Sequence, residues 1–269
     1  MAEGDQVLVD HLEEVWGSIS ELCEGLSEQE WKTMTDLPGW SVQDNVSHIV
    51  DIEQRLDGRP GPEHTPADLS HTRSEFGALN EVGVDWRRSR TGAEVLEEFR
   101  TTTSERLARF RAYGPDDFEA DSWTPLGPGK VRDLLPIRTL DCWVHEQDIR
   151  RALGRPGHTS GPAAETALDR LFGAFGYVVG KKAGVPEGTV VRLSVEGSRT
   201  VTVGMTDGRA GPAPDDAEPD AEIVCDLPTY IALATGRWDR STALQRGVLK
   251  LGGDEDMAGR VADALNVMP

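Results

Sequence analysis

The sequence predicts an α plus α+β fold, in which a helical bundle is followed by a smaller domain of helices and strands. Two observations predict it. The first half contains four long segments whose apolar residues recur at helical spacing, which is typical of a bundle. The second half contains the stretch TVVRLSVEGSRTVTVG, whose alternation at period two predicts a β-hairpin. We therefore expect two domains, 1–156 and 157–269.

The first two long helices are predicted over residues 7–26 and 41–56. Each has apolar residues on one face, at helical spacing. Between them, the segment LPGW predicts a turn. Two capping-box patterns support a short helical turn after the first helix and the start of the second; they are Ser27 with Glu30, and Ser41 with Asp44.

The other two long helices of the bundle are predicted over residues 91–114 and 131–154. Thr91 with Glu94 marks the start of one helix, and Gly154 stands where a C-terminal glycine belongs at the end of the other. The connecting segments, 57–90 and 114–130, are expected to be loops.

The smaller domain is predicted to begin with a helix over residues 162–182, followed by the β-hairpin around Glu196-Gly197-Ser198. Residues 207–219 are rich in Gly, Pro and Asp, which is typical of an exposed loop. The remaining elements are predicted to be a strand, a helix, a strand and a final helix, at 221–225, 228–235, 248–251 and from Asp254.

Charge excludes several classes of partner. Lys and Arg total 28 against 47 Asp and Glu, which gives a formal charge of −19. Nucleic acids and anionic membrane surfaces would repel such a chain, so neither is expected as a partner. No apolar stretch approaches transmembrane length, and no basic segment precedes an apolar run at the N-terminus. We therefore expect no signal peptide and a cytoplasmic location, as a monomer or homodimer.

Two histidines inside predicted bundle helices carry the chemistry. Asp141 precedes His145 by four residues, which places both side chains on one helix face, where they can hold one metal ion. His48, on another bundle helix, is the natural third ligand. Two imidazoles and a carboxylate leave a position for water or substrate, as in catalytic zinc sites. The spacing alone leaves a second interpretation open, in which His48 is a packed or surface histidine.

Neighbouring residues have less specific roles. The cysteines form no CxxC pair, so neither a disulfide framework nor a thiolate metal site is predicted. Cys142 follows Asp141 by one residue, a rotation of about 100° around the helix, so we expect it in the core. Asp148 either supports the metal site or caps an exposed face. Trp40 and Trp143 are expected to pack beside the metal-binding helices.

Three segments of the bundle carry a family resemblance. They are Leu37-Pro38-Gly39-Trp40-Ser41-Val42 before His48, Trp123-Thr124-Pro125, and Arg138-x-x-Asp141-x-Trp143-Val144-His145-x-x-Asp148. Together they resemble the mycothiol-dependent maleylpyruvate isomerase family, within the DinB-like metal-binding superfamily. The stretches DAEI, ATGRW and VLKLGGD resemble the C-terminal domain of that family. The resemblance spans nearly the whole chain and implies a DinB-like four-helix bundle followed by a sterol-carrier-like α+β domain.

The resemblance also implies a divalent metal, zinc, held by His48, Asp141 and His145, with mycothiol as cosubstrate. The isomerase pattern has glutamate where this chain has Asp141, and the shorter side chain puts the metal's identity and affinity in question. The implied chemistry is activation of the mycothiol sulfur as a thiolate, which attacks a small electrophile.

An acidic protein that handles an anionic substrate needs positive charge at its site. We assign this catalytic role to Arg87 and Arg88, which precede the third long helix, and to Arg237 in the smaller domain. Arg246 and Trp123 are assigned to binding of the thiol cofactor, with Trp123 at the mouth of the site.

Three functions remain open. The first is a thiol S-transferase, the second is maleylpyruvate cis–trans isomerase itself, and the third is a non-catalytic module that binds a metal or a small molecule. Hydride transfer with a dinucleotide has little support, because no Gly-rich phosphate loop follows a strand pattern in the sequence.

Overall fold

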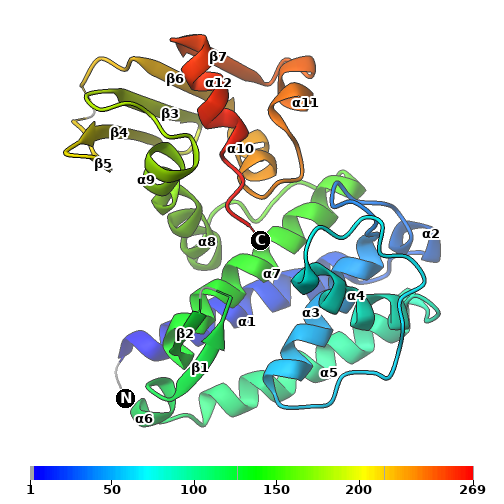
Figure 1. The fold of residues 1–269 in the computed structure, drawn as a ribbon. Coiled ribbons are helices and arrows are strands. Elements are labelled where there is room, and N and C mark those ends of the chain that lie inside the picture. Colours follow the sequence, from blue (N-terminus) through cyan, green and yellow to red (C-terminus); the bar gives the residue numbers. More distant parts are fainter. Residues whose placement is uncertain (1–2, 126, 215, 269) are drawn as a thin grey trace. The chain divides into compact units, whose positions relative to one another are not determined.

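The computed structural model describes residues 3–125, 127–214 and 216–268 (Figure 1). The chain divides into two compact units, Met1–Leu168 and Asp169–Pro269. The division falls inside helix α8 (Pro162–Gly173), whereas the boundary predicted from the sequence follows residue 156. The predicted fold class is confirmed, because a helical unit is followed by a small unit built on a mixed sheet.

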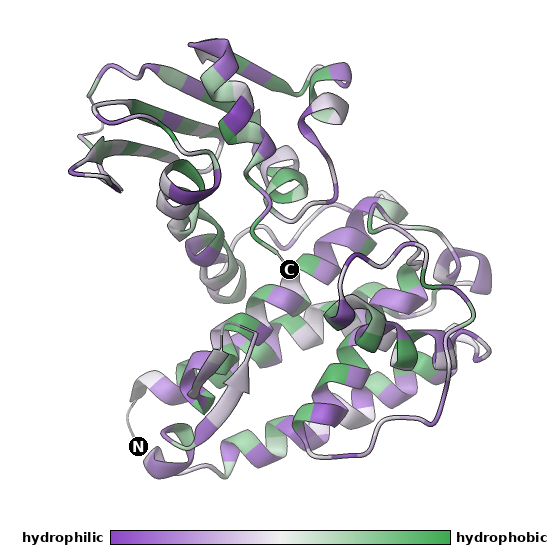
Figure 2. Ribbon diagram, in the orientation of Figure 1, coloured by the Kyte–Doolittle hydropathy of each residue, from purple (hydrophilic) through white to green (hydrophobic). Residues whose placement is uncertain are grey.

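The first unit is built on the four predicted long helices. They are α1 (Glu3–Cys23), α3 (Val42–Leu56), α5 (Gly92–Arg111) and α7 (Val131–Leu153), with the short helix α2 (Glu28–Trp31) after the first. Helix α1 packs against α5 and α7, and α3 packs against the same two helices. Apolar and polar residues alternate along each of them in Figure 2, as expected for helices with one buried face.

The capping patterns in the sequence set the starts of these helices. All three predicted capping boxes are present, at Ser27, Ser41 and Thr91. Gly154 ends α7 in the left-handed conformation, with φ 62°. These caps fix where α3 begins and where α7 ends.

A helix that the sequence analysis missed lies within the expected loop 57–90. It is α4 (Glu75–Arg87), which is capped by Ser74 and packs against α3. Its buried face carries Asn80, Glu81 and Arg87 as well as Val84. Because that face is largely polar, α4 lacks the apolar periodicity from which helices are predicted.

The expected loop 114–130 also contains regular structure. A short helix, α6 (Pro115–Phe118), precedes a two-stranded antiparallel hairpin of β1 (Asp121–Thr124) and β2 (Gly127–Lys130). Thr124 pairs with Gly127, while Leu126, which the expected loop included, lies outside the described residues. Strand β2 has the sequence GPGK, which contains no large apolar residue, so no alternation predicts the hairpin.

The second unit is organised around a five-stranded sheet of order β5-β4-β3-β6-β7. The predicted hairpin is confirmed as β3 (Val190–Glu196) and β4 (Thr200–Thr206), and the predicted strands as β6 (Ala221–Asp226) and β7 (Leu249–Gly253). Strand β6 runs parallel to β3, with Leu193 opposite Ile223, and the other neighbours are antiparallel. The expected loop 207–219 contains an edge strand, β5 (Arg209–Pro212).

Helices complete the core of this unit. The predicted helix 162–182 is interrupted into α8, α9 (Phe175–Tyr177) and the π-helix η1 (Val178–Lys182). Helices α10 (Leu227–Ala234) and α12 (Glu255–Asp263) pack against β6, and the short α11 (Arg240–Gln245) packs against β7.

Among the described residues, no helix combines the length and the apolar character that crossing a membrane requires.

The close approach of α3 and α4 generates a stability prediction. A Cβ atom added at Gly83 would lie 2.0 Å from Oδ1 of Asp51. We expect Gly83→Ala to lower the free energy of unfolding by about 1–3 kcal/mol, because the helices must separate to fit the methyl group. The measurement is chemical denaturation followed by circular dichroism.

Gly77, in the same helix, supplies the matched control. An added Cβ there would lie 3.5 Å from its nearest neighbour, Oγ of Ser74. Gly77→Ala should leave stability unchanged or raise it by up to about 1 kcal/mol, since alanine is the better helix former. Equal stability of the two variants would contradict the packing described for α3 and α4.

Candidate metal centre

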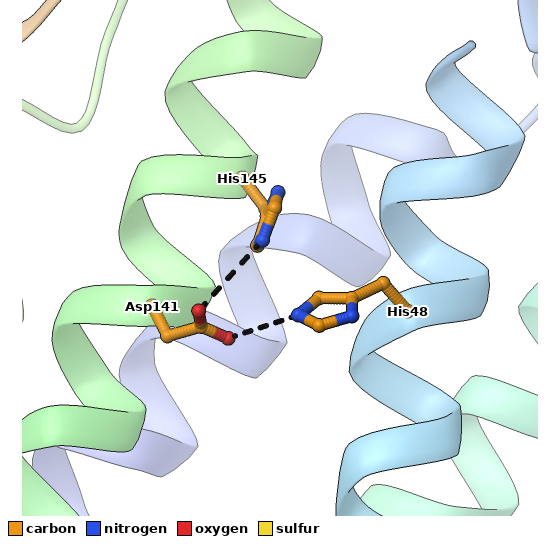
Figure 3. Close-up of side chains that lie close together, drawn as sticks. All are labelled: His48, Asp141 and His145. Carbon is orange, nitrogen blue, oxygen red and sulfur yellow. Dashed lines mark ion pairs between the residues drawn. The ribbon is translucent and has the colours of Figure 1, made fainter. Parts of the chain in front are cut away.

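Helices α3 and α7 bring three possible metal ligands together (Figure 3). Potential ligand atoms of His48, Asp141 and His145 all lie within 4.8 Å of one another. Nε2 of His48 is 3.5 Å from Oδ2 of Asp141, and Nε2 of His145 is 3.8 Å from Oδ1. Both histidines are buried, while 19% of the Asp141 side chain is exposed. The two Nε2 atoms therefore face opposite oxygens of one carboxylate.

Asn45 fixes the tautomer of His145. The Asn45 amide nitrogen donates to the backbone carbonyl of Ser41 at 2.8 Å, so its oxygen is the atom that faces His145. That oxygen lies 2.7 Å from Nδ1 of His145. An amide oxygen can only accept, so Nδ1 carries a proton, and in the neutral ring Nε2 has the lone pair that can bind a metal. This is the form of histidine that binds a metal.

Arg138 fixes Asp141. Its Nη1 donates to Oδ2 of Asp141 at 2.7 Å, and its Nε donates to the buried Glu53 at 2.7 Å. Glu53 also accepts from Nε of Arg106, at 3.1 Å. Burial alone would raise the pKa of Asp141, but the Arg138 guanidinium beside the carboxylate holds that pKa well below its ordinary value. Asp141 is therefore ionised across the physiological range.

The donor set suits a divalent metal of the zinc type. It consists of two imidazole nitrogens and one carboxylate oxygen, and Asn45 and Arg138 hold the two ligands of α7 in the required protonation states. Among the described residues, the grouped ligands number three. Three protein ligands leave a coordination position for a water molecule or a substrate atom.

A comparison with protein families identifies the family to which this helical bundle belongs. Residues 12–150, more than half of the chain, match the model of the mycothiol maleylpyruvate isomerase N-terminal domain. The chain belongs to this family. Residues 181–266 match the model of the SCP-2 sterol transfer family. Both matches agree with the resemblance seen in the sequence.

Solved structures of the mycothiol-dependent maleylpyruvate isomerase share the fold of this family member. A histidine-to-alanine mutant of that enzyme has 14% identity and a TM-score of 0.55, over 92% of each chain. Another structure of it has 15% identity and a TM-score of 0.54, over 87% of this chain and 90% of the other. No curated protein gives a significant match to the chain.

Cys142 and Asp148 also lie on α7, the helix that carries two of the possible metal ligands, Asp141 and His145. Cys142 is fully buried, as predicted, and its sulfur accepts from Nε1 of Trp16 at 3.3 Å. Asp148 is also fully buried, so the interpretation of Asp148 as the cap of an exposed face is wrong. Its Oδ2 lies 3.7 Å from Nδ1 of His145, and its Oδ1 accepts from Arg151.

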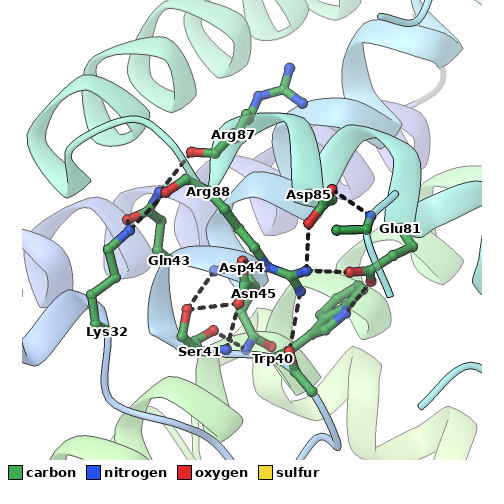
Figure 4. A network of polar contacts seen from close by, with 12 residues as sticks. Lys32, Trp40, Ser41, Gln43, Asp44, Asn45, Glu81, Asp85, Arg87 and Arg88 are labelled. Carbon is green, nitrogen blue, oxygen red and sulfur yellow. Dashed lines mark hydrogen bonds and ion pairs between the residues drawn. The ribbon is translucent and has the colours of Figure 1, made fainter. Parts of the chain in front are cut away.

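Arg87 and Arg88 are both paired with carboxylates of the bundle. Arg87 is 1% exposed and lies 2.9 Å from Glu98 and 3.6 Å from Asp51. Arg88 lies within 3.0 Å of three carboxylates (Figure 4), which belong to Asp44, Glu81 and Asp85. The structure gives both arginines a role in joining α3, α4 and α5, and their contact with a substrate stays a prediction.

The other residues predicted for the site, Trp123, Arg237 and Arg246, do not belong to the helices that carry the three ligands. Trp123, on β1, is 56% exposed, and its ring centroid lies 6.0 Å from that of Phe76. Arg237 and Arg246 belong to the second unit, where Arg237 donates to the carbonyl of Thr235 and Arg246 lies over the Trp238 ring. Their roles at the site stay predictions.

The cysteines generate a prediction about reactivity. Burial raises the pKa of all three thiols, Cys23, Cys142 and Cys225, to about 12. The thiolate is the reactive form, and it becomes populated only as the pH rises toward that value. The folded chain should therefore resist iodoacetamide at pH 8, as measured by intact mass. In denaturant all three thiols should react, and labelling of Cys142 in the folded chain would contradict the packing described.

Proposed function

We propose that this chain is a metal-dependent enzyme that uses a low-molecular-weight thiol, mycothiol, to attack a small electrophile. One observation carries the proposal: a chain of the mycothiol maleylpyruvate isomerase family places two histidines and a carboxylate within 4.8 Å of one another. We propose His48, Asp141 and His145 as the metal ligands and zinc as the metal.

A zinc ion at this centre would lower the pKa of a thiol bound to it, so that the sulfur is available as a thiolate near neutral pH. The residues of the chain prepare the site. Asn45 keeps the proton of His145 on Nδ1, and Arg138 occupies Oδ2 of Asp141, which leaves Oδ1 facing His145. Arg138 thereby fixes the orientation of the shorter carboxylate of this chain, with Oδ1 toward His145 and Oδ2 toward His48.

The fate of the carbon–sulfur bond separates two reactions. In both, the thiolate sulfur donates an electron pair to an electrophilic carbon. In cis–trans isomerisation the sulfur adds to a conjugated double bond, rotation follows, and the sulfur leaves with its electron pair, so that no thiol is consumed. In S-transfer the new carbon–sulfur bond persists and one thiol is consumed for each product. With an alkyl halide, the carbon–halogen bond breaks and the halide leaves with its electron pair. With an unsaturated ketone, the carbon–carbon π bond breaks and the carbon next to the carbonyl takes up the proton that the thiol lost.

Two alternatives follow from the same site. Maleylpyruvate isomerisation is the activity that names the similar solved structures, and it would need positive charge for an anionic substrate, a role we keep for Arg87, Arg88 and Arg237. A non-catalytic module that binds a metal or small molecule would use the same three ligands without turnover. The exposed Trp123 remains our candidate contact for the thiol.

Thiol-dependent turnover tests the proposal. Purified chain should be incubated with mycothiol and each of three electrophiles: maleylpyruvate, a neutral unsaturated ketone and an alkyl halide. We expect turnover of at least one, falling by at least about a hundredfold after chelation and restored by zinc, since metal stabilisation of charge amounts to several kcal/mol. The thiol consumed per product then distinguishes isomerisation from transfer.

A pair of histidine variants provides the control. His145→Ala should abolish turnover because it removes a metal ligand. His11→Ala should retain it, since His11 lies on α1 and contacts Thr166 instead. Thiol-dependent turnover that survives both chelation and His145→Ala would contradict the proposal, and absence of any turnover in a zinc-loaded chain would favour the binding module.

A further inference from the structure

The two histidines of the candidate centre are held in different ways. His145 has a polar partner, because its Nδ1 donates to Asn45. Nδ1 of His48 is buried, and it has no hydrogen-bond partner among the residues that the structure describes. Metal-binding histidines nearly always donate their second ring nitrogen to an acceptor, which fixes the ring. His48 must therefore be oriented by something else.

The indole of Trp40 contacts both histidines. Its centroid lies 5.0 Å from the ring of His48 and 5.7 Å from the ring of His145, with an interplanar angle of 26° to the latter. The two imidazoles themselves are 4.7 Å apart. Trp40 is 7% exposed and immediately precedes the cap of α3. A rigid ring in this place restricts the orientation of His48 by packing rather than by a hydrogen bond.

Glu81, on the unpredicted helix α4, holds that indole in place (Figure 4). Nε1 of Trp40 donates to Oε2 of Glu81 at 2.8 Å, and Glu81 is fully buried. The same carboxylate lies 2.7 Å from Nη1 of Arg88 and 3.0 Å from Nε2 of His71. Arg88 also pairs with Asp44, in the first turn of α3. Glu81 therefore ties α4 to the start of the helix that carries His48.

From these contacts we infer that Glu81 is a positioning residue for the metal centre, acting through Trp40 on His48. The inference rests on the proposed function, because it concerns how the proposed ligand is held. Glu81 is not among the three grouped ligands. Its effect is to keep the indole against His48, so that Nε2 of His48 stays directed at Asp141 without a polar partner on the other side of the ring.

Metal affinity tests the inference directly. Glu81→Leu removes both acceptor oxygens without a large change in volume, and Trp40→Phe keeps an aromatic ring but removes the Nε1 donor. We expect each to raise the Kd for zinc by about 10–100-fold, the usual effect of losing a group that orients a metal ligand. Zinc affinity is measured by competition with a chromogenic chelator, and the visible spectrum of the cobalt-loaded chain reports ligand geometry.

Two further variants separate positioning from folding. Glu81→Gln retains one acceptor and should recover part of the affinity. Glu98→Leu is the matched control, because it also deprives a bundle arginine, Arg87, of a carboxylate partner but does not contact Trp40. It should bind zinc as the wild type does, with an unchanged cobalt spectrum. Thermal unfolding of the metal-free chains reports any loss of stability common to both.

A double variant tests the route of the effect. If Glu81 acts through Trp40, adding Glu81→Leu to Trp40→Phe should change the Kd by less than about twofold, since the two changes break one contact. Fully additive losses would overturn the inference, as would wild-type affinity in both single variants, or equal losses in Glu98→Leu. A wild-type chain that binds no metal would overturn the proposed function as well, which makes the two failures distinguishable.

Discussion

The candidate centre depends on the ion pairs that the buried guanidinium of Arg138 forms. This guanidinium lies between two carboxylates from different helices, Glu53 of α3 and Asp141 of α7. Removing one member of such a buried set costs about 3–5 kcal/mol, because the charges that remain lose their partner. The Arg138 pairs therefore fix the register of α3 against α7, and that register brings His48 opposite Asp141.

Charge balance extends from this point through the bundle. Arg106 shares Glu53 with Arg138, and Arg87 and Arg88 pair with carboxylates of α3, α4 and α5. The excess of acidic residues thus supplies partners for buried arginines as well as an acidic surface. A consequence for function is that the arginines assigned to substrate already have structural partners, so a substrate anion would have to compete with them.

Much of the fold was predictable from local patterns. Apolar periodicity and capping boxes at Ser41 and Thr91 located the bundle helices, since both signals come from residues close in sequence. Period-two alternation located the β3–β4 hairpin. The pairing of Asp141 with His145 followed from the helical repeat, and the choice of His48 as their partner came from the family resemblance in addition to its place on another helix.

Other features depend on contacts between residues far apart in the sequence. Helix α4 was missed because its buried face carries Glu81 and Arg87. Arg87 pairs with carboxylates of α3 and α5, and Glu81 pairs with Arg88 and His71. A hydrogen bond across 41 residues places Glu81 against Trp40. Asn45 was also missed, although the sequence contained a signal for it. It lies three residues before His48, a spacing that places both side chains on the same face of the helix.

Metal content is the most direct test of the central account. The chain should be purified without a metal-affinity tag, offered zinc, dialysed, and analysed for bound elements beside Asp141→Ala. The account predicts about one zinc per wild-type chain and its loss in the variant, as three protein ligands require. A folded wild-type chain that retains no divalent metal would contradict it, and the three side chains would then form a buried ion-pair cluster.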